Sequence, residues 1–435
     1  MEHLYELLDL EVAEALPSDQ LLHALTCHEC REWLVGHLLD QEAEEEGGEG
    51  ADLYSAAFER LERGTTDAAE SASRRRKEAE ELAGELLSLP PDMRETLVTK
   101  ERFQSLDLLG LLLELSHASQ PANPARARAL AETAVTLAVT LGDRTLDAAG
   151  FLPRAFCLGA NACRLQHDLP GAEARLAKAA PFLEKAEERA FYCRTAGLVR
   201  WEEGRSVEAE ALLERAARTF QAEGAPEEAD VCLALLGLLA FEENQVAQAL
   251  PRLHKAWRGL DRESRPQLAL TTGMSFAAAL ALAQQPGKAR QVRDEAWSLY
   301  SAITNPRDMV RIYGLEGRLL GYLGDSAEAE ELLDSVRRKL LAEPSVAEAV
   351  LVSLDLGMVL ATQGKAREIA ELAEELKQSL EGDAPVHIAR VALMSLEEEV
   401  LDGDLMPWEW QLASRVALLR SIRAVGLRLR PLPFV

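Results

Sequence analysis

Three residues near the N-terminus have the types and the spacing of metal ligands. His23, Cys27 and Cys30 form the pattern H-x3-C-x2-C within LLHALTCHECREWLVGHLL, with apolar residues on both sides. Residues four apart share a helix face, so His23 and Cys27 lie together and Cys30 lies one turn further along. An imidazole and two thiolates at this spacing suit tetrahedral zinc. A C-x2-C pair also fits redox chemistry, but thioredoxin-like chemistry needs a preceding strand, and none is predicted here.

This segment resembles the zinc-binding anti-sigma module, whose signature is H-x3-C-x2-C on a small helical bundle. The resemblance covers about 40 of 435 residues and implies a bacterial regulator that engages a sigma factor. The family places its fourth ligand two to three dozen residues upstream, where this chain offers His3; His28 and His37 are the other candidates. Four closed ligands would make the zinc structural. The alternative is a motif without metal, its helices packed by Leu21, Leu22, Trp33, Leu34 and Leu38.

Catalytic motifs are largely absent from the sequence. It contains no G-x-S-x-G, no phosphate-binding G-x4-G-K-[ST] and no G-x-G-x-x-G after a strand. His167 and Asp168 stand together in a predicted loop between helices, where we expect an exposed turn rather than a metal site. Cys27 and His28 could pair as nucleophile and base, but adjacent helical residues point about 100° apart. We therefore predict that the protein is not an enzyme.

The dominant pattern of the chain is a repeat of 40 residues, marked by three columns of small side chains. The columns are Gly197, Gly237, Ala277, Gly317 and Gly357; then Ala209, Ala249, Ala289 and Ala329; then Ala216, Ala256, Ala296 and Val336. A strict period of this length indicates a solenoid. Small residues on facing surfaces let two helix axes approach to about 8–10 Å, which predicts antiparallel hairpins. The predicted turns carry Gly204, Asn244, Gln284, Gly324 and Gly364.

The arrangement resembles the tetratricopeptide repeat, in which the same columns hold Gly or Ala. Gly317, Gly324 and Ala329 in GLEGRLLGYLGDSAEAEELL match that family best. The family unit has about 34 residues, so each unit here is longer by roughly one helical turn. Less regular units carry Ala160, Ala172 and Ala179, then Ala127 and Ala134, and finally Ile369 and Leu376. We predict an all-α, right-handed α-solenoid of about seven hairpins over residues 103–400.

The remaining segments are shorter. Residues 1–40 are predicted to form the small helical, zinc-binding module, and the acidic, glycine-bearing residues 41–53 a flexible linker. Residues 54–102 form a helical connector, with a break at the Pro90-Pro91 pair. Residues 401–435 form a capping helix and tail. The basic residues of this segment could instead contact an acidic partner, and they are Arg415, Arg420, Arg423, Arg428 and Arg430.

Composition and charge limit the possible partners. The formal net charge of −26 disfavours non-specific binding to nucleic acid. The basic run RRRK at 74–77 is followed by EAEELAGELL, whose acidic residues can pair with it along one helix. The sequence shows no signal-peptide pattern and no apolar run of membrane length. We predict a cytoplasmic protein whose partners are neither nucleic acid nor membrane.

In the repeat family, the first helices of the hairpins line a concave groove at fixed offsets from the glycine column. Transferred to this chain, those positions are Arg194, Leu198, Trp201, Leu238, Phe241, Met274, Ala278, Arg311, Arg318, Tyr322 and Met358. The set is mostly apolar with a few arginines. It suits an amphipathic helix or extended segment with apolar anchors and some acidic residues. Alternatively, long repeat helices bury these positions against one another.

Three functions follow from these patterns. The first is a non-enzymatic adaptor that binds a protein partner in the groove and controls a sigma factor through the N-terminal module. The second is a scaffold or effector-binding subunit of a larger complex, with no role in transcription. The third is a peptide-responsive sensor, although such regulators begin with a DNA-reading helix-turn-helix and none is evident here. A bound zinc ion would favour the first function, and a closed, peptide-sized pocket the third.

Overall fold

The computed structural model describes residues 70–142, 146–303, 305–342, 346–379, 384–403 and 408–424. Every regular element in these ranges is helical, which confirms the predicted all-α class. The described chain divides into two compact units. One contains residues 70–97 and 105–111, and the other contains residues 98–104 and the described residues from 112 onward. No helix in the described ranges is both long and apolar enough to span a membrane.

The helices follow one another with short connections. After a helix whose described part covers residues 70–87, they are α6 (Pro91–Val98), α7 (Leu106–Ser119), α8 (Pro124–Gly142), α9 (Leu152–Leu165), α10 (Leu169–Ala179), α11 (Ala186–Glu202), α12 (Ser206–Ala222), α13 (Pro226–Glu242), α14 (Val246–Gly259), α15 (Pro266–Leu282), α16 (Pro286–Trp297), α17 (Pro306–Leu323), α18 (Ser326–Ala342), α19 (Val346–Thr362), α20 (Ala366–Ser379), α21 (Ala384–Asp402) and α22 (Trp408–Ala424). Short 3-10 turns are η1 (Glu101–Phe103), η2 (Leu146–Phe151), η3 (Ala180–Phe182) and η4 (Tyr300–Ala302).

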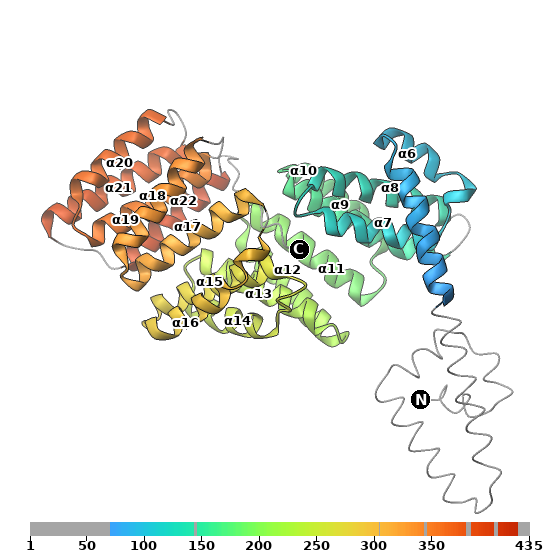
Figure 1. Ribbon diagram of the computed structural model, residues 1–435, viewed down its shortest axis with the longest axis horizontal. Helices are drawn as coiled ribbons and strands as arrows, with labels where there is room; N and C mark the ends of the chain where they lie inside the picture. The colour runs from blue at the N-terminus through green and yellow to red at the C-terminus, as the bar shows by residue number, and fades with distance from the viewer. Residues whose placement is uncertain are drawn as a thin grey trace, which may run out of the picture. The chain divides into compact units, whose positions relative to one another are not determined.

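Consecutive helices of the second unit pack as hairpins. α9 contacts α10, α11 contacts α12, α13 contacts α14, α15 contacts α16 and α17 contacts α18. Neighbouring hairpins are joined by further contacts, such as those of α12 with α13 and of α14 with α15. Figure 1 shows this succession from the green α11 and α12 to the orange and red α17–α22. The predicted helical solenoid is therefore confirmed.

The predicted turn residues share one backbone conformation. Their φ angles are positive: 76° at Gly204, 60° at Asn244, 59° at Gln284, 84° at Gly324 and 70° at Gly364. At each turn the next backbone N–H donates to a carbonyl five residues earlier, as in the 2.9 Å bond from Arg205 to Arg200. This left-handed ending satisfies carbonyls that the helix leaves open and reverses the chain. The turn column of the sequence therefore marks where each first helix ends.

The first small column gives each hairpin its close approach. A Cβ atom added to Gly237 would lie 2.7 Å from Cγ of Leu253, on the second helix of the same hairpin. Gly197 and Gly317 face Leu213 and Leu333 in the same way. Only glycine leaves room for the leucine here, because protein interiors are close-packed.

The last hairpin packs differently. A Cβ atom on Gly357 would meet Leu393 of α21 rather than a residue of α20. The larger Ile369 and Leu376, which replace alanine in the second and third columns, are fully buried. α20 packs extensively against α21, which also contacts α19. The change in the columns therefore coincides with a three-helix arrangement of α19, α20 and α21.

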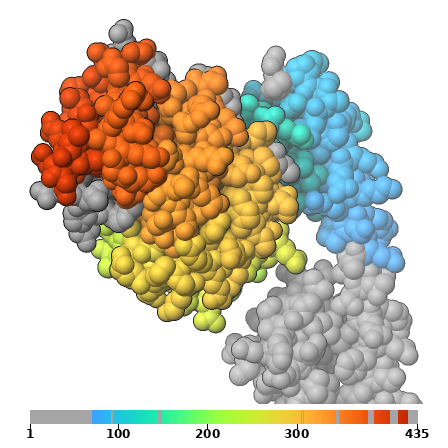
Figure 2. Space-filling model, turned by 60° about the vertical axis from the view of Figure 1, so that its left-hand side comes forward, coloured from blue at the N-terminus to red at the C-terminus, as the bar shows by residue number. Residues whose placement is uncertain are grey.

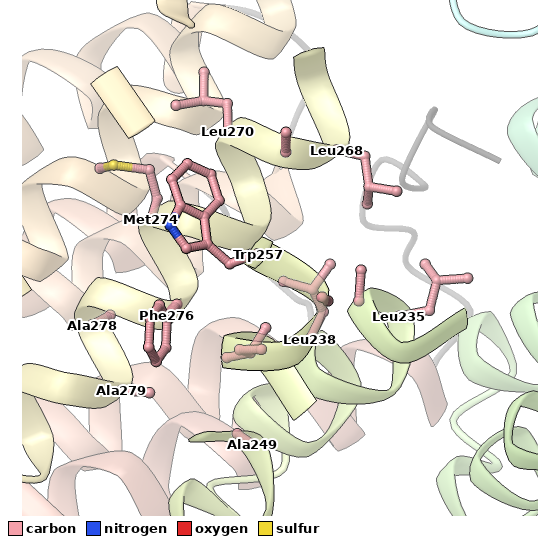
Figure 3. Close-up of a cluster of buried hydrophobic side chains, with 14 of the residues drawn as sticks. Leu235, Leu238, Ala249, Trp257, Leu268, Leu270, Met274, Phe276, Ala278 and Ala279 are labelled. Carbon is pink, nitrogen blue, oxygen red and sulfur yellow. The ribbon is translucent and has the colours of Figure 1, made fainter. Parts of the chain in front are cut away.

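The core is continuous through the middle hairpins. Trp257 of α14 lies over Gly273 of α15, where an added Cβ would be 2.6 Å from the indole. Figure 3 shows Trp257 beside Met274, with Phe276 and Leu238 nearby. α15 is apolar on all sides and is buried over most of its length, as expected for a helix covered on both faces. In Figure 2 the orange α17 and α18 lie between the yellow and red hairpins without a break.

Candidate functional site

The first helices of successive hairpins line a cavity in the second unit. α9, α11, α13, α15, α17 and α19 contribute residues to it, and α22 provides a further wall. The cavity has a volume of about 230 Å³. First helices share one side of a solenoid because each hairpin repeats the orientation of the one before it. The repeat thus brings together residues about 40 positions apart in the sequence.

Much of the predicted groove lies in this cavity. The residues of that set that line it are Leu198, Trp201, Leu238, Phe241, Arg311, Arg318 and Tyr322. Leu198, Leu238 and Arg318 occupy one repeat position, so Arg318 is a charged residue in an otherwise apolar column. Whether the cavity binds a partner stays a prediction.

Other predicted groove residues lie elsewhere. Met274, Ala278 and Met358 are completely or almost completely buried in the core, because α15 and α19 are covered on both faces. Arg194 is only 2% exposed and forms an ion pair with Glu228. Its guanidinium also lies over the rings of Phe191 and Phe220, at 4.9 and 5.4 Å from their centroids. These residues hold helices together and do not line the cavity.

A chain of buried hydrogen bonds supports one wall of the cavity. Gln120 accepts a 2.7 Å bond from Asn161 Nδ2, and Asn161 Oδ1 accepts a 2.8 Å bond from Arg164 Nε. Arg164 also donates to Glu202 Oε1 at 3.2 Å. The chain runs from α7 through α9 to α11. Buried polar groups are stable when each is paired, so this network fixes the relative positions of these first helices.

Two glutamates at equivalent repeat positions have opposite titration behaviour. Glu202 and Glu242 are the last residues of α11 and α13. Burial raises the pKa of Glu202, and the nearby Arg164 offsets this only in part. Burial also acts on Glu242, but Arg423 of α22 and the indole N–H of Trp201 hold its pKa below the ordinary value. Arg423 Nη2 lies 2.9 Å from Glu242 Oε2, so α22 sets the ionisation of this carboxylate.

Arg318 is the cation of the cavity that stands apart from these pairs. Among the residues that the structure describes, its Nε is buried and has no hydrogen-bond acceptor, and no carboxylate lies within ion-pair distance. Its guanidinium carbon lies 5.7 Å from the centroid of the Phe241 ring. Burial and the neighbouring Arg415 lower the pKa of Arg318, since both disfavour its charge. The site can therefore accept an anionic group.

Tyr322 adds a neutral donor to the cavity. Burial raises the pKa of Tyr322 to about 12, so its hydroxyl keeps its proton at neutral pH. Asp355 of α19 accepts a 2.9 Å bond from Arg415 Nε. The cavity therefore combines apolar walls with Arg318 and a phenol.

The sequence signals for part of this site are visible in retrospect. Glu202 and Glu242 stand 40 residues apart, each two positions before a turn residue. That column could have identified both as functional candidates. No comparable pattern predicts Asp355 or its partner Arg415, which are 60 positions apart.

The predicted zinc ligands His3, His23, Cys27 and Cys30, and the alternatives His28 and His37, lie outside the described residues. The described part of the chain shows no cluster of three His, Cys, Asp or Glu side chains arranged for a metal ion. The cysteines at 157, 163, 193 and 232 are buried on repeat helices, as predicted. Burial raises the pKa of Cys157 and of Cys232 to about 12, so these thiols stay protonated.

His167 and Asp168 form a turn, as predicted. His167 has a φ of 62°, and Asp168 Oδ1 accepts a 2.9 Å bond from the backbone N–H of Gly171. Asp168 thereby caps α10, and it also pairs with Arg128 at 3.3 Å. Both residues therefore have structural roles in the repeat.

Comparison with known proteins identifies the fold. No protein-family model matches the chain, and no curated protein matches its sequence. The crystal structure of a Rap protein complexed with competence and sporulation factor is similar over 71% of this chain and 88% of that one. The TM-score is 0.53 and the sequence identity is 13%. The protein therefore shares the helical-repeat fold of that Rap protein.

Proposed function

We propose that the protein is a non-enzymatic regulator that binds a short segment of a protein or peptide partner in the cavity. Apolar side chains of the segment pack against Leu198, Leu238 and Phe241, and a carboxylate pairs with Arg318. The lone buried charge of Arg318 carries this proposal, because a buried cation is costly until an anion neutralises it. The Rap protein complexed with competence and sporulation factor supports the proposal, since it is a protein of this fold with a bound factor.

The size of the cavity favours a short segment over a whole helix. Its volume of about 230 Å³ is below the about 300–1,000 Å³ that is typical of ligand pockets. A few side chains fill such a space. This favours a peptide-responsive sensor as the second candidate function, ahead of a passive scaffold. A free peptide and a terminal segment of a larger protein share the required chemistry: apolar anchors and one carboxylate.

The test selects ligands without assuming their source. A library of random peptides, displayed with free C-termini, is selected on the immobilised full-length chain. We expect the selected peptides to share apolar residues next to an acidic side chain or the terminal carboxylate. Titration calorimetry then compares the wild type with Arg318→Met, for which we expect an affinity loss of about 10–100-fold. Amidating the terminus separates capture of a free C-terminus from capture of an internal acidic residue.

Arg367→Met is the matched control. Arg367 lies on α20, its side chain is 88% exposed, and it pairs only locally with Glu371. This change removes the same charge and should leave the affinity unchanged. Peptides that bind Arg318→Met and the wild type equally well would contradict the cavity as the binding site.

We further propose that His3, His23, Cys27 and Cys30 hold a structural zinc ion and that this module engages a sigma factor. The motif supports this part of the proposal. Metal analysis of the purified chain should give about one zinc per molecule, and Cys27→Ser/Cys30→Ser should remove it. A sigma factor that co-purifies with the wild type but not with this variant would support the role in transcription. Wild-type protein without zinc, or the same partners with both proteins, would end it.

A further inference from the structure

The C-terminal helix α22 reaches acidic groups in two separate parts of the array. Its contacts are Arg415 with Asp355 at 2.9 Å, Arg423 with Glu242 at 2.9 Å and Arg420 with Glu243 at 2.8 Å. Asp355 belongs to α19, whereas the two glutamates stand at the end of α13, 181 and 177 residues before their partners. A cap needs contacts with the last hairpin alone. The arginines of α22 therefore do more than cover the end of the solenoid.

The acidic end of α13 is poorly matched to its own helix. Glu242 is the last helical residue and Glu243 follows it. Carbonyl groups already make a helix C-terminus negative, so two carboxylates there are unfavourable without a nearby cation. On the preceding repeat, the equivalent Glu202 receives Arg164 from α9. Glu242 instead receives its cation from α22, which makes the end of α13 an acceptor site for an arginine of another segment.

The surface beneath α22 has defined chemical requirements. Leu418, Leu419 and Ile422 of α22 are fully or almost fully buried in an apolar cluster shared with α19 and α21. Arg415 and Arg423 lie on the same helix eight residues apart, which corresponds to about 12 Å along the axis. The seat therefore fits an amphipathic helix with two arginines at this spacing and apolar residues between them. Such a basic helix is complementary to a chain of net charge −26.

We infer that this surface is a docking site for a basic amphipathic helix of a partner protein, and that α22 occupies it in the absence of that partner. We call the surface the α22 seat; it comprises Asp355, Glu242 and Glu243 with the apolar cluster of α19 and α21. The partner helix replaces α22 and neutralises the same buried carboxylates. Helix-in-groove recognition of this kind depends on apolar anchors at spacings of three, four and seven residues.

The seat is separate from the binding contacts of the proposed function, but it adjoins them. Val416 and Leu419 of α22 line the cavity that contains Arg318. Arg420 also lines a second cavity of about 350 Å³, together with Ser206, Glu208 and Gln245. Displacing α22 therefore removes a wall from both cavities. Occupation of the seat controls access to the site for the short segment.

The experiment uses the full-length chain and a designed helical probe of 17 residues, the length of α22. The probe has arginines eight positions apart and leucines three, four and seven positions after the first arginine, in an alanine and glutamine background. Its labelled form is titrated into the wild type and into Arg415→Glu/Arg423→Glu, in which repulsion from Asp355 and Glu242 releases α22. We expect the probe to bind the variant at least about 30-fold more tightly than the wild type.

Two controls match the net charge. Arg338→Glu/Arg367→Glu changes two arginines whose side chains are 73% and 88% exposed, and it should bind the probe like the wild type. A probe with both arginines replaced by glutamate should bind none of the proteins. A folded, monomeric Arg415→Glu/Arg423→Glu variant that does not bind the basic probe overturns the proposal. A released variant that forms a dimer also overturns it, because the seat would then take a second copy of the chain.

Hydrogen exchange gives a test that does not depend on the folding of the variant. In the wild type, saturating probe should speed the exchange of amides in α22 by about tenfold or more, while α11–α14 keep their protection. Exchange in α22 that does not change with probe, and matches that of α13, would show that α22 is a fixed part of the core. The short peptides selected for the Arg318 cavity can still bind in that case, so the two proposals fail separately.

Discussion

Two arginines of the same cavity are held in opposite ways. On the α9 wall, Arg164 is completely buried and bonds both Asn161 and Glu202. On the α17 wall, Arg318 lies near an aromatic ring, without a carboxylate partner among the described residues. The first arrangement stabilises the fold, since each buried group is paired. The second leaves free energy to be gained when an anion arrives. The cavity therefore has a structural wall and a binding wall.

The largest expected effect breaks the structural wall. Arg164→Met removes the cation from Glu202 and the donor from Asn161, and it leaves both buried groups with one partner fewer. We expect the free energy of unfolding to fall by about 4 kcal/mol, because an uncompensated buried charge remains. Urea denaturation followed by circular dichroism measures this. A loss no larger than that of the exposed Arg367→Met would show that the network does not stabilise the α9 wall.

The next prediction extends the contrast to the packing of early and late hairpins. Gly237→Ala places a methyl 2.7 Å from Cγ and 3.1 Å from the backbone nitrogen of Leu253, so the two helices must separate. We expect a loss of about 3 kcal/mol. In Gly357→Ala the closest atom is the terminal Cδ2 of Leu393, which can rotate away, and the loss should stay below about 1 kcal/mol. Melting temperatures that fall equally in both variants would contradict this ranking.

A third prediction concerns a group kept neutral in the first half of the array. Burial lowers the pKa of His117 to about 4, assisted by Arg194, Arg265 and Arg154 and opposed by Glu228. Between pH 6.5 and 4 the unfolded chain takes up this proton while the folded chain does not, so stability falls as pH decreases. We expect a loss of about 2 kcal/mol over that window, fully recovered above pH 6.5. His117→Gln should remove this part of the slope, and an unchanged slope would refute the assignment.

The smallest stability effect sharpens the distinction between the two walls. Arg318→Met replaces a partly buried guanidinium that has no acidic partner in the described structure with an apolar side chain of similar length. We expect stability to rise by up to about 1 kcal/mol while peptide affinity falls. Separate measurements of the urea midpoint and of the affinity test this. A clear loss of stability would place Arg318 with Arg164 as a structural residue.

The repeat could be predicted because its signals are local and periodic. Gly237 and Ala249 repeat at 40 residues, and turn residues such as Gly324 adopt the left-handed conformation that ends a helix. Part of the cavity follows from the same period, since Leu198 and Leu238 share one position and one environment. Arg318 departs from that column, and this departure is itself a sequence signal for a site.

The rest could not be predicted, because it depends on contacts without a period. Met274 occupies a groove offset, but α15 is covered on both faces and buries it. Arg423 contacts Glu242 across 181 residues, and nothing in either segment specifies the other. The sequence identified the basic C-terminal helix and left open whether its arginines cap the array or meet acidic groups. The structure shows both contacts with α19 and α21 and ion pairs with the end of α13.

The central claim is that Arg318 anchors a short acidic segment within the cavity. A crystal structure of the full-length chain with the tightest selected peptide tests it most directly. The account predicts a peptide carboxylate at about 2.8 Å from the Arg318 guanidinium, with apolar side chains against Leu198 and Leu238. A peptide bound to the outer helices, with the Arg318 cavity empty, would contradict it.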